Sequence, residues 1–283
     1  MSILSDNDIK QELGINILIY PFTQDNLKGA SYNLTASKYA WSLSTKQSIY
    51  NSLQDKIIIA PGDTALIETN ETVWVSKKIT GTYHSRVTQV SQGTGHIGTT
   101  LDPNYIGPSL ISLPNHSSNP VELIPETTNF VTLAFQYLHT ESSREHGNTH
   151  GRRDILGEVG IQTNREESNA LDKPYMSNKD LLLLKLEECK DYQSIKSERE
   201  KKANQNNTEV QNKNKKILSL KLYAAFIGLI LVLGLLTGYL QANQKQLGQK
   251  NWYAGTNYTI NALMIVISSA LTALITVDLN RKI

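Results

Sequence analysis

The sequence predicts a mainly β soluble module, then a helical connector and two transmembrane α-helices. Three observations predict this class: short β-prone runs broken by turn residues, a Lys- and Glu-rich helical pattern after Asn178, and two long apolar runs near the C-terminal end. A chain of 283 residues has room for one sizeable domain plus appendages. We expect a β domain, an arm or linker, a helical connector and a membrane region at residues 1–140, 141–176, 177–216 and 217–283.

The first 140 residues carry the β pattern. Ser5 is placed to cap a short helix over Asp6–Leu13, and Pro61-Gly62-Asp63 makes a tight turn between two strand-like runs. The β-prone runs are Ile15–Tyr20, Ser31–Ser37, Lys56–Ala60, Ala65–Glu68, Val73–Val75, Leu110–Leu113, Val121–Ile124 and Phe130–Tyr137. Many short strands with frequent turns are typical of a sandwich, a jelly roll or a barrel, and the pattern leaves these three open.

The connector reads as a helix from Asn178 onward. Leu182, Leu186 and Cys189 form one apolar face of that helix. Three clean heptads are absent, so the pattern does not predict a coiled coil. After Ser197 the chain is dominated by Lys, Glu, Asn and Gln, which is consistent with either a solvated helix or a flexible tether.

Two apolar runs, Leu222–Leu240 and Ile260–Val277, are each close to the roughly 20 residues that a membrane-spanning helix needs. The segment between them holds only two lysines, Lys245 and Lys250, whereas four precede the first run: Lys213, Lys215, Lys216 and Lys221. The positive-inside rule therefore puts the N-terminal part in the cytoplasm, and two spans return the C-terminus to the same side. We expect a multi-pass membrane protein in contact with lipid.

The second apolar run is the more polar of the two, with Ser268, Ser269, Thr272 and Thr276. These hydroxyls indicate either a pore-lining face or hydrogen bonds to neighbouring helices. No charged residue lies within the run, since Asp278 falls beyond its end. A two-helix transporter without an intramembrane charge is not favoured.

Composition excludes several classes. A net charge of +2 does not favour a nucleic-acid-binding protein, and the single cysteine, Cys189, permits no intrachain disulfide. The histidines lack the spacing of a zinc site, so no metal site built from protein ligands is expected.

Six segments together resemble the dCTP deaminases of the trimeric dUTPase-like superfamily: Ile3–Ile9, Ile17–Phe22, Gly29–Leu34, Ala60–Asp63, Thr69–Val73, and Leu101–Gly107 with Asn115 after it. The most specific is Leu101-Asp102-Pro103-Asn104-Tyr105-Ile106-Gly107, which resembles the motif Asp-x-x-Tyr-x-Gly. The resemblance covers about half the chain. It implies a dUTPase-like jelly-roll or barrel fold, a homotrimer, and deoxynucleoside triphosphate sites between subunits.

The resemblance also implies roles for particular residues. Tyr105 would pack on the deoxyribose and exclude a ribose 2′-OH, and Asp102 would hold or activate a water. The segment around Ser85 would meet the phosphates, with Mg²⁺ bound alongside the nucleotide. Arg86, although displaced from the family's arginine position, and Asn115 are the other expected nucleotide-binding residues.

The segment Glu141–Asn164 resembles, by composition, the mobile arms that cover nucleotide phosphates in this superfamily. It holds Arg144, His146, Arg152 and Arg153, and arginine suits multidentate contact with phosphate. A solvated linker is the other interpretation of this segment.

At three positions the sequence departs from the family pattern. Asn33 stands where the family has an aspartate, His84-Ser85-Arg86 replaces Arg-Ser-Ser or Arg-Ser-Gly, and Ser112 falls where deaminases have their proton-shuttling glutamate. Without that carboxylate the proton has no carrier, so deamination is the activity least expected.

These observations predict a membrane-anchored deoxynucleotide-binding protein that is catalytically degenerate and acts as a nucleotide sensor coupled to a membrane effector. A trimer would bring six helices together, and a role in antiphage (antiviral) defence follows by analogy alone. The alternatives are an active membrane-tethered dUTP pyrophosphatase, in which Asp102 is the base, an active dCTP deaminase, and a scaffold without ligand.

Overall fold

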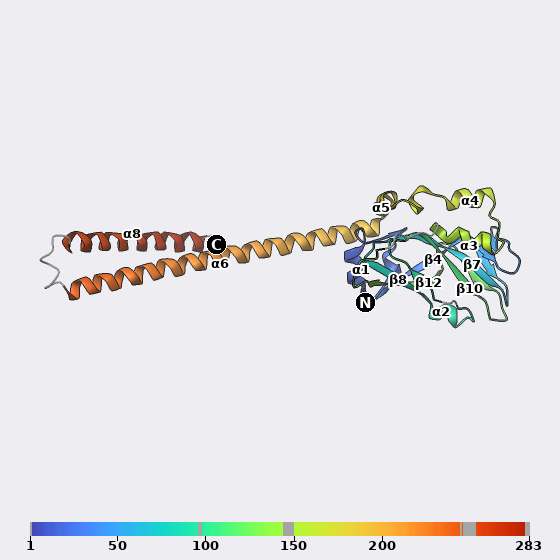
Figure 1. The fold of residues 1–283 in the computed structure, drawn as a ribbon, viewed down its shortest axis with the longest axis horizontal. Helices are drawn as coiled ribbons and strands as arrows, with labels where there is room; N and C mark the ends of the chain where they lie inside the picture. Colours follow the sequence, from blue (N-terminus) through green and yellow to red (C-terminus); the bar gives the residue numbers. More distant parts are fainter. Residues whose placement is uncertain (1, 96–97, 144–149, 244, 246–252, 281–283) are drawn as a thin grey trace. The chain divides into compact units, whose positions relative to one another are not determined.

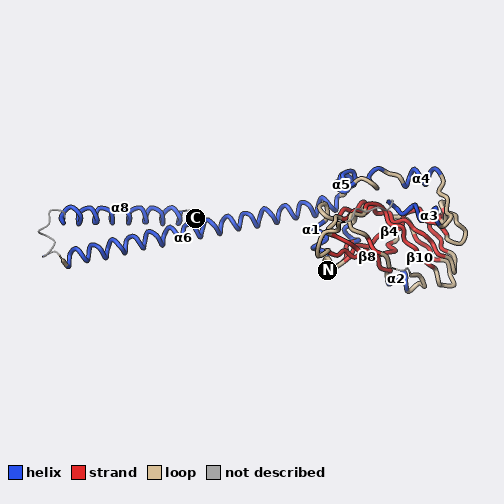
Figure 2. The backbone as a smooth tube through the Cα atoms, in the orientation of Figure 1, coloured by secondary structure: helices blue, strands red, loops and turns tan. Residues whose placement is uncertain are grey.

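The computed structural model describes residues 2–95, 98–143, 150–243, 245 and 253–280. The chain forms two compact units, residues 1–200 and residues 201–283. The first unit is mainly β and the second is helical, which confirms the predicted fold class (Figure 1, Figure 2). Lys250, Arg144 and His146, named above, lie outside the described residues.

The main sheet has nine strands, all paired antiparallel, in the order β10-β7-β4-β12-β8-β9, with β1 on β12, β2 on β7 and β3 on β4. Its strands are β1 (Ser2–Ile3), β2 (Ile17–Tyr20), β3 (Leu27–Lys28), β4 (Ser31–Ser42), β7 (Thr64–Val75), β8 (Ile79–Ser85), β9 (Thr100–Leu101), β10 (Ile106–Pro114) and β12 (Asn129–Tyr137). A smaller sheet holds β5 (Tyr50–Asn51), β6 (Lys56–Ile59) and β11 (Val121–Leu123).

The long strand β4 divides its pairing between two neighbours. Its first part, from Tyr32 to Thr35, pairs with β12, and its second part, from Ala36 to Ser42, pairs with β7. Both pairings contain a register shift, and such bulges bend and twist a strand. The sheet therefore curls around one apolar core, which includes Leu34, Ile67 and Phe130.

The helical elements are α1 (Asp6–Glu12), α2 (Val87–Val90), α3 (Arg153–Glu158), α4 (Arg165–Leu171), α5 (Lys179–Glu187), α6 (Lys190–Ala242) and α8 (Tyr253–Asn280), with short 3-10 turns η1 (Gln24–Asn26), η2 (His150–Arg152) and η3 (Pro174–Met176). Ser5 caps α1 as the sequence predicts, in a reciprocal capping box with Asp8.

The apolar face predicted for the connector is buried against the β domain of the same chain. Leu182 and Leu186 of α5 are fully buried, and Tyr192 in the first turn of α6 is 3% exposed. Asp191 accepts a hydrogen bond of 2.7 Å from the backbone N–H of Gln24. The start of α6 is therefore part of the core.

Arg199 ties α6 to the end of α1. Its Nη1 lies 2.8 Å from the carbonyl oxygen of Gln11, 2.9 Å from that of Leu13 and 3.3 Å from that of Lys10. The last carbonyls of a helix lack partners within the helix and carry partial negative charge. A guanidinium at this point satisfies them and complements the helix dipole.

Residues 150–161, which we call the strap, comprise η2, α3 and the turn after it. Leu156 and Ile161 of the strap are 2% and 3% exposed and pack against Trp41 and Leu66. Gly151 has a φ of +69°, and a Cβ at this position would lie 3.2 Å from Oε2 of Glu68, so only glycine fits closely here. The strap thus covers the outer face of β7 and β10.

Glu68 of β7 is enclosed beneath the strap and is 2% exposed. Burial raises the pKa of Glu68 to about 8, and the nearby cations Arg153 and Lys173 offset part of that effect. At neutral pH this carboxyl is therefore largely protonated.

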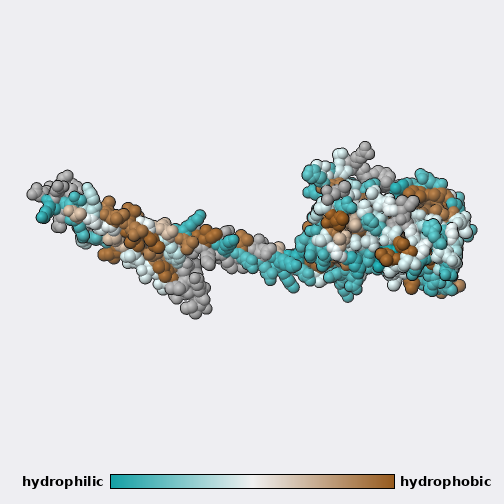
Figure 3. Space-filling view, turned by 90° about the horizontal axis from the view of Figure 1, so that it is seen from below, coloured by the Kyte–Doolittle hydropathy of each residue, from teal (hydrophilic) through white to brown (hydrophobic). Residues whose placement is uncertain are grey.

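The second unit contains two helices that are long and apolar enough to cross a membrane. They are Leu220–Ala242, of 23 residues, within α6, and Tyr258–Thr276, of 19 residues, within α8, close to the predicted runs 222–240 and 260–277. Leu240 and Ile260 are in contact, with Leu233 beside them. Apolar surface gathers along these helices in Figure 3, and the preceding turns of α6 are hydrophilic.

We predict that Arg199→Ala lowers the free energy of unfolding of the first unit by about 1–3 kcal/mol, because the α1 carbonyls lose a charged donor. Thermal unfolding of the full-length protein in detergent, followed by tryptophan fluorescence, measures the effect. Lys202→Ala, at an exposed position in the next turn of α6, is the control. Equal stability of the two variants would contradict the capping role.

We predict that the stability of the first unit falls as the pH rises from about 5 to about 8. The unfolded state ionises Glu68 over this interval while the folded state keeps its proton, so unfolding is favoured. Glu68→Gln removes this component, on the order of 2 kcal/mol or more by pH 8. Melting temperatures across the interval test it, with the exposed Glu158→Gln as control; a parallel pH slope in wild type and Glu68→Gln would refute it.

Candidate functional site

A turn between β9 and β10 carries the two residues of the Asp-x-x-Tyr motif. The Tyr105 N–H donates to the carbonyl oxygen of Asp102 at 3.2 Å, and Asn104 has a φ of +64°. Pro103 in the second position and a positive φ in the third are features of a type II turn. The turn places the Asp102 side chain in solvent and the Tyr105 ring inside, where Tyr105 is 6% exposed.

The Tyr105 side chain lies on a floor of hydroxyl groups. The Tyr105 hydroxyl donates to the carbonyl oxygen of Pro108, and the Tyr83 hydroxyl is hydrogen-bonded to Ser109. The Ser109 N–H donates to Thr69 Oγ1 at 2.9 Å. Burial raises the pKa of both Tyr83 and Tyr105, so these phenols are neutral and act as hydrogen-bonding groups.

Asp102 and Tyr105 line one cavity of about 120 Å³ together with Arg152 of the strap. Tyr83, Ser109 and Ile155 are among its other polar and apolar lining residues. Arg152 has a left-handed backbone (φ +49°) and is bound to the carboxylate of Asp154, with Nη2 at 3.1 Å and Nε at 3.3 Å. This carboxylate raises the pKa of Arg152.

Ser85 and Arg86 lie on a different surface. They line an open groove of about 590 Å³ along the neighbouring strands β4, β12 and β8, with Lys28, Asn33 and His84. Its charged lining residues within the described chain are the cations Lys28 and Arg86, so the groove suits an anion. Arg86 Nη1 donates to the carbonyl oxygen of Asn129 at 2.8 Å, which fixes its direction.

The structure does not bring Asn115 into either cavity. Asn115 is fully buried, and its Nδ2 donates to the carbonyl oxygens of Ile59 and Asn119 at 3.0 Å and 2.8 Å. Its Oδ1 accepts from the N–H and hydroxyl of Ser117. The side chain has used both donors and both acceptor sites, and it holds the loop after β10.

Arg153 also lies apart from the Asp102 cavity. Its Nη1 is 3.4 Å from Asp172, and it lies close enough to Glu68 to oppose the rise in the pKa of that carboxyl. Its Nε and Nη2 are buried without a hydrogen-bond partner in the described part of the chain.

Asn33 and Ser112, the two positions at which the resemblance implies carboxylates, lie in different environments. Asn33 is 3% exposed and accepts a hydrogen bond of 2.8 Å from Thr132, whereas Ser112 is exposed on β10. Glu68, which the sequence analysis missed, faces Leu110 across the β7–β10 ladder and raises the pKa of Tyr105. Glu68 lies close to Tyr105 because β7 pairs with β10, so no local sequence signal reveals this proximity.

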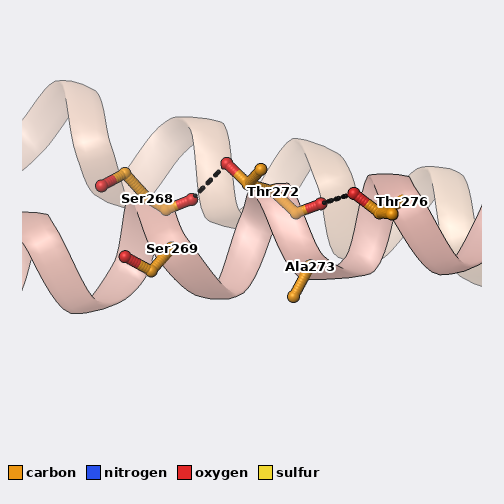
Figure 4. Close-up of a pocket in the computed structure, with 5 residues that line it drawn as sticks. All are labelled: Ser268, Ser269, Thr272, Ala273 and Thr276. Atoms are coloured by element: carbon orange, nitrogen blue, oxygen red, sulfur yellow. Dashed lines mark hydrogen bonds between the residues drawn. The ribbon is translucent and has the colours of Figure 1, made fainter.

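One further groove lies along α8 in the second unit (Figure 4). Ser268, Ser269, Thr272, Ala273 and Thr276 line it. The hydroxyl of Thr272 donates to the carbonyl oxygen of Ser268 and that of Thr276 to Thr272, both at 2.9 Å, as the dashed lines show. These hydroxyls are satisfied by their own helix and offer no reactive group.

Comparison with known proteins gives consistent results. The sequence model of the family described as dCTP deaminase-like matches residues 3–130. The chain is 30% identical over 155 residues to the dCTP deaminase of Pyrococcus abyssi, covering 54% of this chain and 96% of that protein. It is 31% identical over 121 residues to that of Pyrococcus horikoshii, covering 43% and 74%.

Solved structures similar to this chain include the 2′-deoxycytidine 5′-triphosphate deaminase from Agrobacterium tumefaciens, with a TM-score of 0.40, 12% identity and 48% of each chain covered. Another is a dUTPase of EIAV, with a TM-score of 0.33, 19% identity, and 47% of this chain and 98% of that one covered. The sequence match to the Pyrococcus abyssi protein, in contrast, covers nearly the whole length of that protein. On those matches, this chain belongs to the dCTP deaminase-like family.

Proposed function

We propose that this protein is a membrane-anchored deoxynucleotide sensor that binds its ligand without turning it over. The observation that carries this proposal is the composition of the site. Asp102, Tyr105 and Arg152 line one cavity, whereas Asn33 and Ser112 stand at positions where deaminases have carboxylates. The groups suited to binding are present, and the group that would move protons is absent.

The chemistry of deamination supports this proposal. Attack of water on the cytosine ring needs a carboxylate that takes a proton and returns it to the ring and the leaving ammonia. Ser112 cannot do this, and Glu68 is sealed beneath the strap with its pKa raised to about 8. Asn33 carries no charge and is bound to Thr132.

The separation of the two cavities supports a homotrimer with sites between subunits. Within one chain, Ser85 and Arg86 lie in the cationic groove, and Asp102 and Tyr105 line the other cavity. A complete site needs the groove of one subunit to face the cavity of another, which places phosphates by Arg86 and deoxyribose by Tyr105.

Mg²⁺ would enter such a site with the nucleotide. No group of three or more His, Cys, Asp or Glu residues in the described chain could hold a metal ion. The available donor is the exposed carboxylate of Asp102, so the phosphates and water would supply the other oxygens.

The membrane helices would anchor the sensor and act as its effector. The lysines before Leu222 favour a cytoplasmic first unit with both termini on that side, and the two helices would contact lipid. A trimer would bring six such helices together. Antiphage defence is a role that this arrangement suits by analogy.

A membrane-tethered dUTP pyrophosphatase is the second candidate, because Asp102 is exposed and shares a cavity with Arg152.

We predict that the full-length protein in detergent leaves dUTP and dCTP unchanged in the presence of Mg²⁺, as followed by chromatography. Release of dUMP, or conversion of dCTP to dUTP, that is lost in Asp102→Ala would establish an enzyme instead.

We predict that the protein binds dUTP or dCTP in preference to UTP or CTP, and that Tyr105→Ala lowers deoxynucleotide affinity about tenfold and abolishes the preference. The reason is that the Tyr105 ring would contact the deoxyribose where a 2′-OH collides. Calorimetric titration measures both effects, with Tyr50→Ala in the small sheet as control. Unchanged discrimination in Tyr105→Ala would show that the sugar binds elsewhere.

A further inference from the structure

We propose that the part of α6 next to its apolar segment binds the phosphate groups of anionic lipids in the adjacent membrane leaflet. The binding groups are the ammonium groups of Lys213 and Lys221. This inference rests on the membrane anchoring in the proposed function, and it adds the class of lipid that the anchor prefers.

Positive charge is concentrated in the residues that lead into the first apolar segment, Leu220–Ala242. Residues 201–221 hold six lysines and one acidic residue, Glu209. Lys213 and Lys221 are exposed, and neither forms an ion pair among the described residues. Their charges are therefore available to a ligand, and a surface of anionic lipid headgroups is complementary to them.

The distance of each lysine from the start of the apolar segment suits contact with headgroups. An α-helix rises about 1.5 Å per residue, so Lys213 precedes Leu220 by about 10 Å along α6. The headgroup layer is roughly 5–8 Å thick, and charge attraction extends about 8 Å beyond it at physiological salt. Lys221 is the second residue of the apolar segment, where a long aliphatic side chain can lie among acyl chains while its ammonium reaches the phosphates.

Exposed apolar side chains lie on the same side of α6 as these two lysines. Four residues share one third of the helix circumference: Lys213, Ile217, Leu220 and Lys221. Ile217 and Leu220 are exposed. Apolar side chains between two cations match the boundary between acyl chains and headgroups, whereas a soluble anion would leave these side chains in water. The face therefore favours a lipid over a free phosphate compound.

The opposite end of the apolar segment carries tyrosines. Tyr239 and Tyr258 are exposed and are close in sequence to Leu240 and Ile260, which are in contact. Tyr239 follows Lys221 by about 27 Å along the helix, close to the roughly 30 Å of a hydrocarbon core. Tyrosine rings favour a membrane interface without selecting a charged lipid. The selectivity for anionic lipid is therefore assigned to the lysine end.

The test compares the lipids that surround the full-length protein in phosphatidylcholine vesicles. Trace phosphatidylglycerol or phosphatidylcholine, spin-labelled on an acyl chain, reports by electron paramagnetic resonance the fraction of each lipid held against the protein. At about 0.1 M salt we expect phosphatidylglycerol to associate with the wild type about threefold more strongly than phosphatidylcholine, or better. At about 1 M salt, where the Debye length is about 3 Å, the preference should fall below about twofold.

Two double variants locate the effect. Lys213→Gln with Lys221→Gln should lower the preference below about twofold at the lower salt concentration. Lys201→Gln with Lys202→Gln removes the same charge from exposed positions about 27 Å or more before Leu220, and should keep the wild-type preference. Equal losses in the two double variants, or an unchanged preference in the first, would overturn the assignment.

Inorganic phosphate distinguishes a lipid site from a site for a soluble anion. At equal ionic strength, replacing NaCl by sodium phosphate should leave the lipid preference unchanged, and its selective loss would assign the lysines to a soluble anion instead. Equal association of the two lipids with the wild type would refute the lipid preference and leave the anchoring intact. If neither lipid is held against the protein, the membrane anchoring is refuted as well.

Discussion

The divided pairing of β4 is the constraint on which the rest of the first unit depends. One strand hydrogen-bonds to β12 along its first part and to β7 along its second, so the sheet must turn where the partner changes. β7 also pairs with β10, and the outer face of these two strands is not covered by the main core. Leu66 and Glu68 lie on this face, and the strap covers them.

Covering that face decides the chemistry of the site. A glycine at position 151 lets the backbone approach Glu68 closely, and the residues next in sequence, Arg152 and Ile155, then close the cavity at Tyr105. Burial of a carboxyl without a strong counter-ion favours its neutral form, so Glu68 contributes shape and a proton rather than a charge. The cavity consequently combines the exposed carboxylate of Asp102 with Arg152, which is already paired with Asp154, above a floor that carries no charge.

Much of this architecture could be predicted from local sequence signals. Ser5 followed by Asp8 specifies the cap of α1, the two apolar runs specify the long helices, and Asp102-Pro103-Asn104-Tyr105 specifies a turn. Local signals also predicted the apolar face of α5. They could not predict the surface against which that face packs, because packing between elements distant in sequence leaves no periodic pattern.

The remainder depends on contacts that no short segment encodes. Glu68 lies beside Tyr105 only because β7 pairs with β10, and Asn115 is saturated only because the loop after β10 folds back on β6. Arg152 and Arg153 are adjacent in sequence, yet one lines a cavity and the other lies beside a buried carboxyl. Such differences follow from the left-handed backbone at Arg152, which sequence alone does not reveal.

The burial of Tyr192 and the contacts of Arg199 have a consequence for how the chain is made. The first unit cannot complete its core until the start of α6 has left the ribosome, and only residues 201–219 then separate it from the first long apolar helix. Domains generally fold as units during synthesis. Completion of the first unit and synthesis of the long apolar helices are therefore nearly simultaneous events, and a shortened α6 would bring them closer still.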